Sequence, residues 1–120
     1  MRQKRINYVL DLVEALSLDY NEQYQGIEPF AKWNLPEEIG LEWIDAYEMG
    51  ILTSVIESDV MPENCQKLLI KIYNDFNMAF DNLEYSEIWT HQAMESHPFW
   101  QKQREAARFI LENWRKQSVT

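Results

Sequence analysis

Three residues near the chain's two histidines have a spacing that could hold a metal ion. Glu87, His91 and Glu95 lie four residues apart, so a continuous helix would place them on one face. Metal sites in proteins usually draw three or four ligands from more than one element. The sequence offers no His-Glu-x-x-His motif, no Glu-x-x-His pair and no second cysteine. We therefore interpret the three residues as a polar helix face and expect no metal ion.

The single cysteine, Cys65, is a poor candidate for a nucleophile. It shares an apolar stripe with Leu69 and Ile72, which is the setting of a buried, unreactive thiol. A lone cysteine also excludes a disulfide within the chain. The three glycines are isolated, so there is no phosphate-binding loop, and no nucleophile stands with a base and an orienting acid. We expect that the protein is not an enzyme and that it uses no cofactor.

The most unusual segment, residues 37–50, reads EEIGLEWIDAYEMG and holds five carboxylates and no base. At 100° per residue, Ile39, Trp43, Ala46 and Tyr47 fall on one side of a helix and predict a buried face. The outward side combines acids with two apolar side chains. We predict that it forms the partner-binding set: Glu38, Leu41, Glu42, Asp45, Glu48 and Met49. Like charges three or four residues apart cost about 0.2–0.5 kcal/mol each, so this acidic stripe slightly destabilises its own helix.

Two interpretations of the acidic stripe stay open. It is either a solvated face that keeps the protein soluble or a surface that docks a basic partner. Between Asp11 and Glu63, thirteen acids accompany one base, Lys32, which favours docking. The other bases gather towards the chain ends and could neutralise the stripe across the fold: Arg2, Lys4, Arg5, Lys102, Arg104, Arg108, Arg115 and Lys116. The net charge of −9 argues against direct binding of nucleic acid.

The pattern of apolar residues predicts an all-α fold, a compact bundle of about five helices in a single domain over residues 1–120. We expect helices over residues 3–20, from the Asn34 cap to about Gly50 (with another turn or two beyond it), 62–80, 87–95 and 98–116. Pro36, Pro62 and Pro98 stand where three of them begin. Asn34 and Glu37 have the spacing of a capping box, and residues 21–33 read as a polar connection.

The ends and the hydropathy of the chain predict a cytoplasmic protein. The first twenty residues open with basic side chains but include Asp11 and Glu14 before any long apolar run, unlike a signal peptide. No stretch approaches 18 uninterrupted apolar residues, so we expect no membrane span.

The last predicted helix carries an arginine inside an apolar stripe. Trp100, Arg104, Ala107, Leu111 and Trp114 are spaced three and four residues apart, and a second stripe comprises Phe99, Ala106 and Ile110. We interpret both stripes as core packing. The arginine in such a stripe usually lays its stem on an aromatic face or pairs with a carboxylate.

The same C-terminal segment carries a resemblance. A Trp-Thr pair beside a short helix is followed by a tryptophan, an arginine, an alanine and a leucine: Trp89, Thr90, Trp100, Arg104, Ala107 and Leu111. Upstream, YEMGIL (residues 47–52) and MPEN (residues 61–64) continue the pattern. It resembles small all-helical bacterial immunity proteins, including those of contact-dependent growth inhibition. The resemblance spans roughly the C-terminal two-thirds of the chain, and its motif residues imply structure rather than a binding site.

The leading hypothesis is therefore an immunity protein that binds and neutralises a cognate bacterial toxin. Small size, strong acidity, surplus tryptophan and the lack of a catalytic motif all fit a protein–protein interaction with a toxin domain that has a basic surface. The alternative is another acidic interaction module, such as an adaptor, an antitoxin, a phage inhibitor or a DNA mimic. Competition by DNA would separate a DNA mimic from the rest.

Overall fold

The computed structural model describes residues 2–26 and 29–118, and every regular element in these ranges is helical. The α-helices are α1 (Arg2–Ser17), α2 (Tyr20–Gln25), α3 (Leu35–Glu48), α4 (Ile51–Glu57), α5 (Glu63–Asp81), α6 (His91–Ser96) and α7 (Pro98–Ser118). Two 3-10 helices, η1 (Pro29–Asn34) and η2 (Leu83–Trp89), join them. The all-α prediction is confirmed, but the predicted number of helices is too low.

One extra helix, α2, arises because a polar side chain caps a new helix where the apolar periodicity alone suggested that the first would continue. The first helix was predicted to extend to residue 20, but α1 ends at Ser17. Asp19 then caps α2 in a capping box: its carboxylate accepts from the backbone N–H of Glu22, and the Glu22 carboxylate accepts in return from that of Asp19. The connection predicted for residues 21–33 therefore holds α2 and most of η1.

The boundaries around the acidic stripe also differ from expectation. Asn34 makes no capping hydrogen bond at the start of α3; its amide instead donates to Glu38 Oε1 at 3.2 Å. The predicted capping box is thus wrong, and Pro36 in the first turn supplies the start signal. The helix ends at Glu48, two residues before Gly50, whose φ of +77° lies in the left-handed region that glycine adopts without strain. The helical stretch predicted beyond Gly50 is α4.

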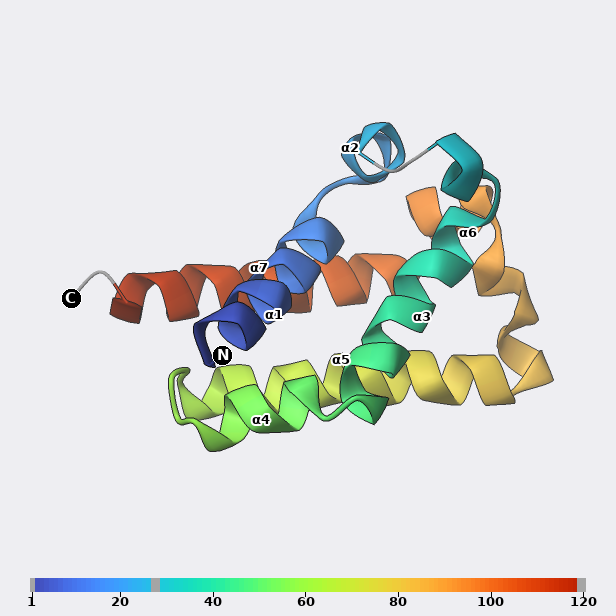
Figure 1. Ribbon diagram of the computed structural model, residues 1–120. Helices are drawn as coiled ribbons and strands as arrows, with labels where there is room; N and C mark the ends of the chain where they lie inside the picture. The colour runs from blue at the N-terminus through green and yellow to red at the C-terminus, as the bar shows by residue number, and fades with distance from the viewer. Residues whose placement is uncertain (1, 27–28, 119–120) are drawn as a thin grey trace.

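The long helices α5 and α7 run antiparallel and pack together, with α1 lying over α7 and α3 crossing α5 (Figure 1). The short α4 packs beside α1. The centre is aromatic: Trp43, Phe76 and Trp100 are fully buried, and the Phe76 ring centroid lies 6.5 Å from that of Trp43 and 5.5 Å from that of Trp100. Burial of such rings is the main favourable term in folding a domain of this size.

Gly40 permits the closest contact between α3 and the rest of the bundle. A Cβ atom at this position would lie 2.9 Å from the rings of Phe80 and Trp89, which stack on each other at 4.1 Å. Glycine therefore weakens the helix by propensity but lets α5 and η2 pack directly against its backbone. This contact fixes the buried side of α3 and, as a consequence, its outward side.

Within the described ranges, no helix combines the length and the apolar character needed to cross a bilayer.

Candidate partner-binding surface

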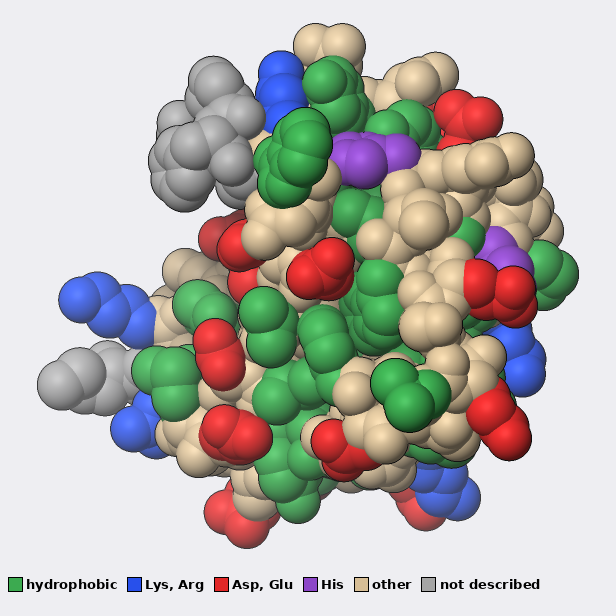
Figure 2. All heavy atoms as spheres, turned by 90° about the vertical axis from the view of Figure 1, so that its right-hand side faces the viewer, with side chains coloured by type: hydrophobic (Ala, Val, Ile, Leu, Met, Phe, Trp, Pro, Cys, Tyr) green, Lys and Arg blue, Asp and Glu red, His purple; other side chains and the backbone are tan. Residues whose placement is uncertain are grey.

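The structure places the six predicted partner-binding residues along the solvent side of α3 and its C-terminal end. Glu42, Asp45 and Glu48 are exposed and Glu38 is half-buried. The two apolar members are exposed as well, Leu41 to 42% and Met49 to 71%. On the face that includes α3, hydrophobic side chains fill the middle and acidic side chains lie around them (Figure 2). The helix thus presents carboxylates and apolar atoms on the same side of the molecule.

Tyr47 differs from its predicted place in the core. It is 39% exposed, and its ring stacks on that of Tyr73 from α5 with 3.9 Å between centroids and 11° between planes. Burial raises the pKa of Tyr73, and the neighbouring Tyr47 and Glu48 raise it further. The stacked pair extends the apolar part of the surface onto α5. Sequence reasoning missed Tyr73 because nothing in the local pattern links it to α3.

Electrostatic repulsion acts within the acidic stripe. Crowding by neighbouring atoms raises the pKa of Glu42, and the charges of Glu38 and Asp45 raise it further, although the side chain as a whole is exposed. Burial also raises the pKa of Tyr8 in α1, with smaller contributions from Glu42 and Asp45. The negative potential therefore extends from α3 to the neighbouring surface of α1.

The described basic side chains do not form ion pairs with these carboxylates. The ion pairs in the described part of the chain are Lys67–Glu63, Lys71–Asp75 and His97–Glu87. Arg5 donates instead to Ser54 Oγ at 3.0 Å. For Arg2, Arg115 and Lys116 the structure describes the helical backbone but not the side chain. Neutralisation by the chain's own bases is thus not seen for the part of the molecule that is described.

The polar helix face predicted for Glu87, His91 and Glu95 does not form, because the helix is interrupted at Thr90. Glu87 belongs to η2 and the other two residues to α6, whose N-cap is Thr90. His91 hydrogen-bonds to the Tyr20 hydroxyl and the Trp33 carbonyl, whereas the Glu87 carboxylate lies 3.6 Å from His97 Nε2. Among the described side chains, no three potential metal ligands gather at one point.

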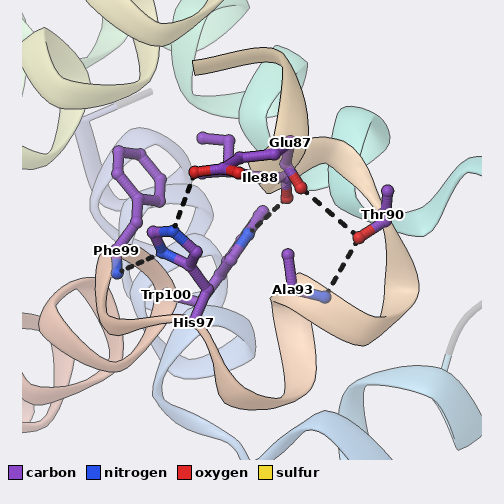
Figure 3. A network of polar contacts seen from close by, with 7 residues as sticks. All are labelled: Glu87, Ile88, Thr90, Ala93, His97, Phe99 and Trp100. Atoms are coloured by element: carbon purple, nitrogen blue, oxygen red, sulfur yellow. Dashed lines mark hydrogen bonds and ion pairs between the residues drawn. The ribbon is translucent and has the colours of Figure 1, made fainter. Parts of the chain in front are cut away.

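Several motif residues of the C-terminal segment hold η2, α6 and α7 together (Figure 3). Thr90 Oγ1 accepts from the backbone N–H of Ala93, which caps α6. The Trp100 indole donates to the carbonyl of Ile88 at 2.8 Å, and both residues are buried. His97 Nδ1 accepts from the backbone N–H of Phe99 at 3.0 Å. The predicted structural role of Thr90 and Trp100 is confirmed.

Arg104 is buried as predicted, but its partners are neither aromatic faces nor carboxylates. Its guanidinium donates to the carbonyls of Leu18 and Met94 and to the side-chain oxygen of Gln23, at 3.0, 2.7 and 2.9 Å. Burial lowers the pKa of Arg104, the nearby Arg108 lowers it further, and Asp19 partly opposes both. The side chain thus joins α7 to the ends of α1, α2 and α6. Cys65 is buried as well, and burial raises the pKa of its thiol.

Comparison with known proteins returned no matching family, no matching curated protein and no matching solved structure. The resemblance to immunity proteins stays a prediction.

Proposed function

We propose that this protein is an immunity protein that binds a cognate toxin domain with a basic surface and neutralises it in the bacterial cytoplasm. The observation that carries the proposal is the outward side of α3, where exposed carboxylates without a described ion-pair partner surround exposed apolar side chains. Protein–protein interfaces usually combine an apolar centre with a polar rim. Glu42 and Asp45 are the central acids, and Met49 and Leu41 are the apolar contacts.

Both parts of this surface have a physical role in the proposal. The carboxylates attract a basic toxin, raise the rate of association and disfavour acidic competitors. The apolar side chains gain free energy when the partner removes them from water. A DNA mimic, the main alternative, would place carboxylates at phosphate-like intervals over a long surface, whereas here an exposed Met49 and the stacked Tyr47–Tyr73 pair lie among the acids. The combination therefore favours a protein partner, and we propose that this chain does not itself bind nucleic acid.

A co-purification experiment tests the proposal. The chain is expressed with a tag beside the C-terminal domain encoded by the gene directly upstream, where a toxin gene is expected. We expect a 1:1 complex at about 150 mM salt that weakens sharply near 1 M, where the screening length falls to about 3 Å. We also expect cells that express the toxin domain to survive when this chain is present.

The result that would overturn the proposal is the absence of both a complex and rescue. A complex that excess duplex DNA displaces, without rescue of the cells, would identify a DNA mimic instead.

A further inference from the structure

A second feature of the surface is an aromatic cleft between α2, η1 and α6. Its lining residues are Tyr20, Tyr24, Lys32, Trp33 and His91, and its volume is about 650 Å³. This size falls within the range of ligand pockets in proteins, which is roughly 300–1,000 Å³. The indole of Trp33 is 90% exposed, so an aromatic side chain stands in water where no helix covers it.

Hydrogen bonds and ring contacts hold the cleft in shape. His91 Nε2 lies 3.1 Å from the Trp33 carbonyl, which can only accept, so this nitrogen carries the proton. His91 Nδ1 is then free to accept from the Tyr20 hydroxyl at 2.7 Å. The imidazole packs edge-on against Tyr20 and Tyr24, with ring centroids 5.8 and 6.0 Å away. This arrangement fixes two tyrosine rings beside the exposed indole before any ligand arrives.

The chemistry of the lining favours a cation. The ammonium group of Lys32 already lies 4.8 Å from the centroid of Tyr24, which is the distance of a cation–π contact. Lys32 is the one cation among the described lining residues. Burial raises the pKa of Tyr20 and the neighbouring Tyr24 and Glu95 raise it further, so the charge of the Glu95 carboxylate acts at the wall of the cleft. An anionic ligand would gain one ammonium partner and be repelled by the Glu95 carboxylate, whereas a cationic ligand would meet aromatic faces and an attractive charge.

We propose that this cleft receives an arginine side chain of the basic partner, whose guanidinium stacks on the faces of Trp33 and Tyr24. Arginine fits better than lysine because its planar, weakly hydrated cation stacks on aromatic rings. In the free protein Lys32 occupies the face of Tyr24, and the incoming arginine displaces it. The choice of a basic protein as the source of this arginine rests on the proposed function. The affinity of the cleft for a guanidinium group does not.

The test uses the full chain and a small probe, Nα-acetyl-arginine methylamide, with its neutral isostere Nα-acetyl-citrulline methylamide as the control. Binding is followed through the indole N–H resonance of Trp33 in nitrogen-15 correlation spectra, assigned with Trp33→Phe. We expect saturable shifts with the arginine probe, at an affinity on the order of millimolar, and much smaller shifts with the citrulline probe. Equal shifts with both probes, or none, would overturn the inference.

Variants then separate cleft binding from general attraction to an acidic protein. Trp33→Ala, at an exposed position, should weaken arginine binding about three- to fivefold when read from the backbone amides of α2. Lys32→Gln should strengthen binding because it frees the face of Tyr24. The matched control Lys67→Gln removes the same charge from an exposed site on α5 and should leave the affinity unchanged. An equal gain in affinity from both lysine variants would contradict the inference that arginine binds in the cleft.

The outcomes for the cleft and for the proposed function remain distinguishable. A toxin complex that forms while the arginine probe leaves Trp33 unperturbed would overturn the cleft and leave the immunity proposal intact. Binding of the probe at Trp33 without any toxin complex or rescue would support the cleft and overturn the immunity proposal. Preferential binding of an anionic probe, Nα-acetyl-glutamate methylamide, would show that Lys32 dominates and would also overturn the inference.

Discussion

Arg104 is the only ionised side chain among the described buried residues, and none of its hydrogen bonds is to a carboxylate. Its guanidinium binds two main-chain carbonyls and one amide oxygen instead. Burial lowers the pKa of Arg104, and the carbonyl dipoles partly compensate for its loss of hydration. Removing the side chain leaves three acceptors near the core without their donor.

We predict that Arg104→Leu lowers the free energy of unfolding by about 2–4 kcal/mol, because an unsatisfied buried acceptor costs about 1–3 kcal/mol. Arg108→Leu is the matched control: Arg108 also donates to a carbonyl, that of Ser17 at 2.8 Å, but it is exposed, so water can replace it. Urea unfolding of the two variants measures the difference. Equal losses would mean that burial of the Arg104 hydrogen bonds is unimportant.

The two central tryptophans differ in their hydrogen bonding. The Trp100 indole donates to the Ile88 carbonyl, whereas the buried indole nitrogen of Trp43 has no partner. Replacing either residue by phenylalanine removes a similar volume from the core. We predict that Trp100→Phe costs about 1–2 kcal/mol more than Trp43→Phe in thermal or urea unfolding, because only the former leaves a buried carbonyl unpaired. A larger cost for Trp43→Phe would refute this explanation.

At the scale of the elements, the regular apolar periodicity of α5 and α7 allowed them to be predicted almost to their ends. The breaks at Asp19 and Thr90 were missed because single capping side chains interrupt an apolar pattern that itself continues. The exposure of Tyr47 could not be predicted either, since it depends on Tyr73, 26 residues further along the chain. The aromatic cleft was missed for the same reason: Tyr20 and His91 meet only in the folded protein.

Gly40 gives a prediction in which packing opposes helix propensity. Alanine at an exposed helical position would stabilise the helix by up to about 1 kcal/mol. At Gly40 the new methyl group would lie 2.9 Å from Phe80 and Trp89, so we predict a net loss of about 1–3 kcal/mol. The loss should shrink in a Trp89→Ala background, which removes two of the three nearest atoms. If Gly40→Ala alone stabilised the protein in urea unfolding, Phe80 and Trp89 could not be packed against this position as closely as described.

The raised pKa of Glu42 makes the stability of the folded protein depend on pH, and the sign of this dependence follows from the direction of the shift. Because the folded protein raises the pKa of Glu42 above its ordinary value of 4.5, the folded state binds more protons than the unfolded state just above that pH. The contribution of Glu42 to stability is therefore fully present below about pH 4.5 and is lost as the pH rises through the raised pKa.

We predict that Glu42→Gln raises the melting temperature at pH 7 and that this gain disappears near pH 4, where Glu42 is protonated in both states. Glu37→Gln makes the same chemical change in the first turn of α3, where a negative charge is favourable, and should give no gain. Melting curves at pH 4, 5, 6 and 7 test both statements. A gain for Glu42→Gln that is constant across this range would rule out the repulsion.

At the scale of the whole molecule, the net charge is −9, and no described basic side chain forms an ion pair with the carboxylates of α3. The acidity was evident from composition, but whether the described bases pair with the acidic stripe depends on the fold, and among the described side chains they do not. We propose that this surface and the aromatic cleft together are complementary to a basic protein that offers both apolar contacts and arginine side chains. In this proposal the outward side of α3 binds such a partner.

The most direct test is the affinity of the purified complex with the toxin domain after reversal of two charges. The double variant Glu42→Lys and Asp45→Lys should weaken binding at least about tenfold, because each close charge pair at an interface is worth roughly 1.5 kcal/mol or more. The control, Glu105→Lys with Glu112→Lys, makes the same change in net charge on exposed positions of α7 and should alter the affinity by less than about threefold. Equal effects of the two pairs would contradict the claim that α3 is the binding surface.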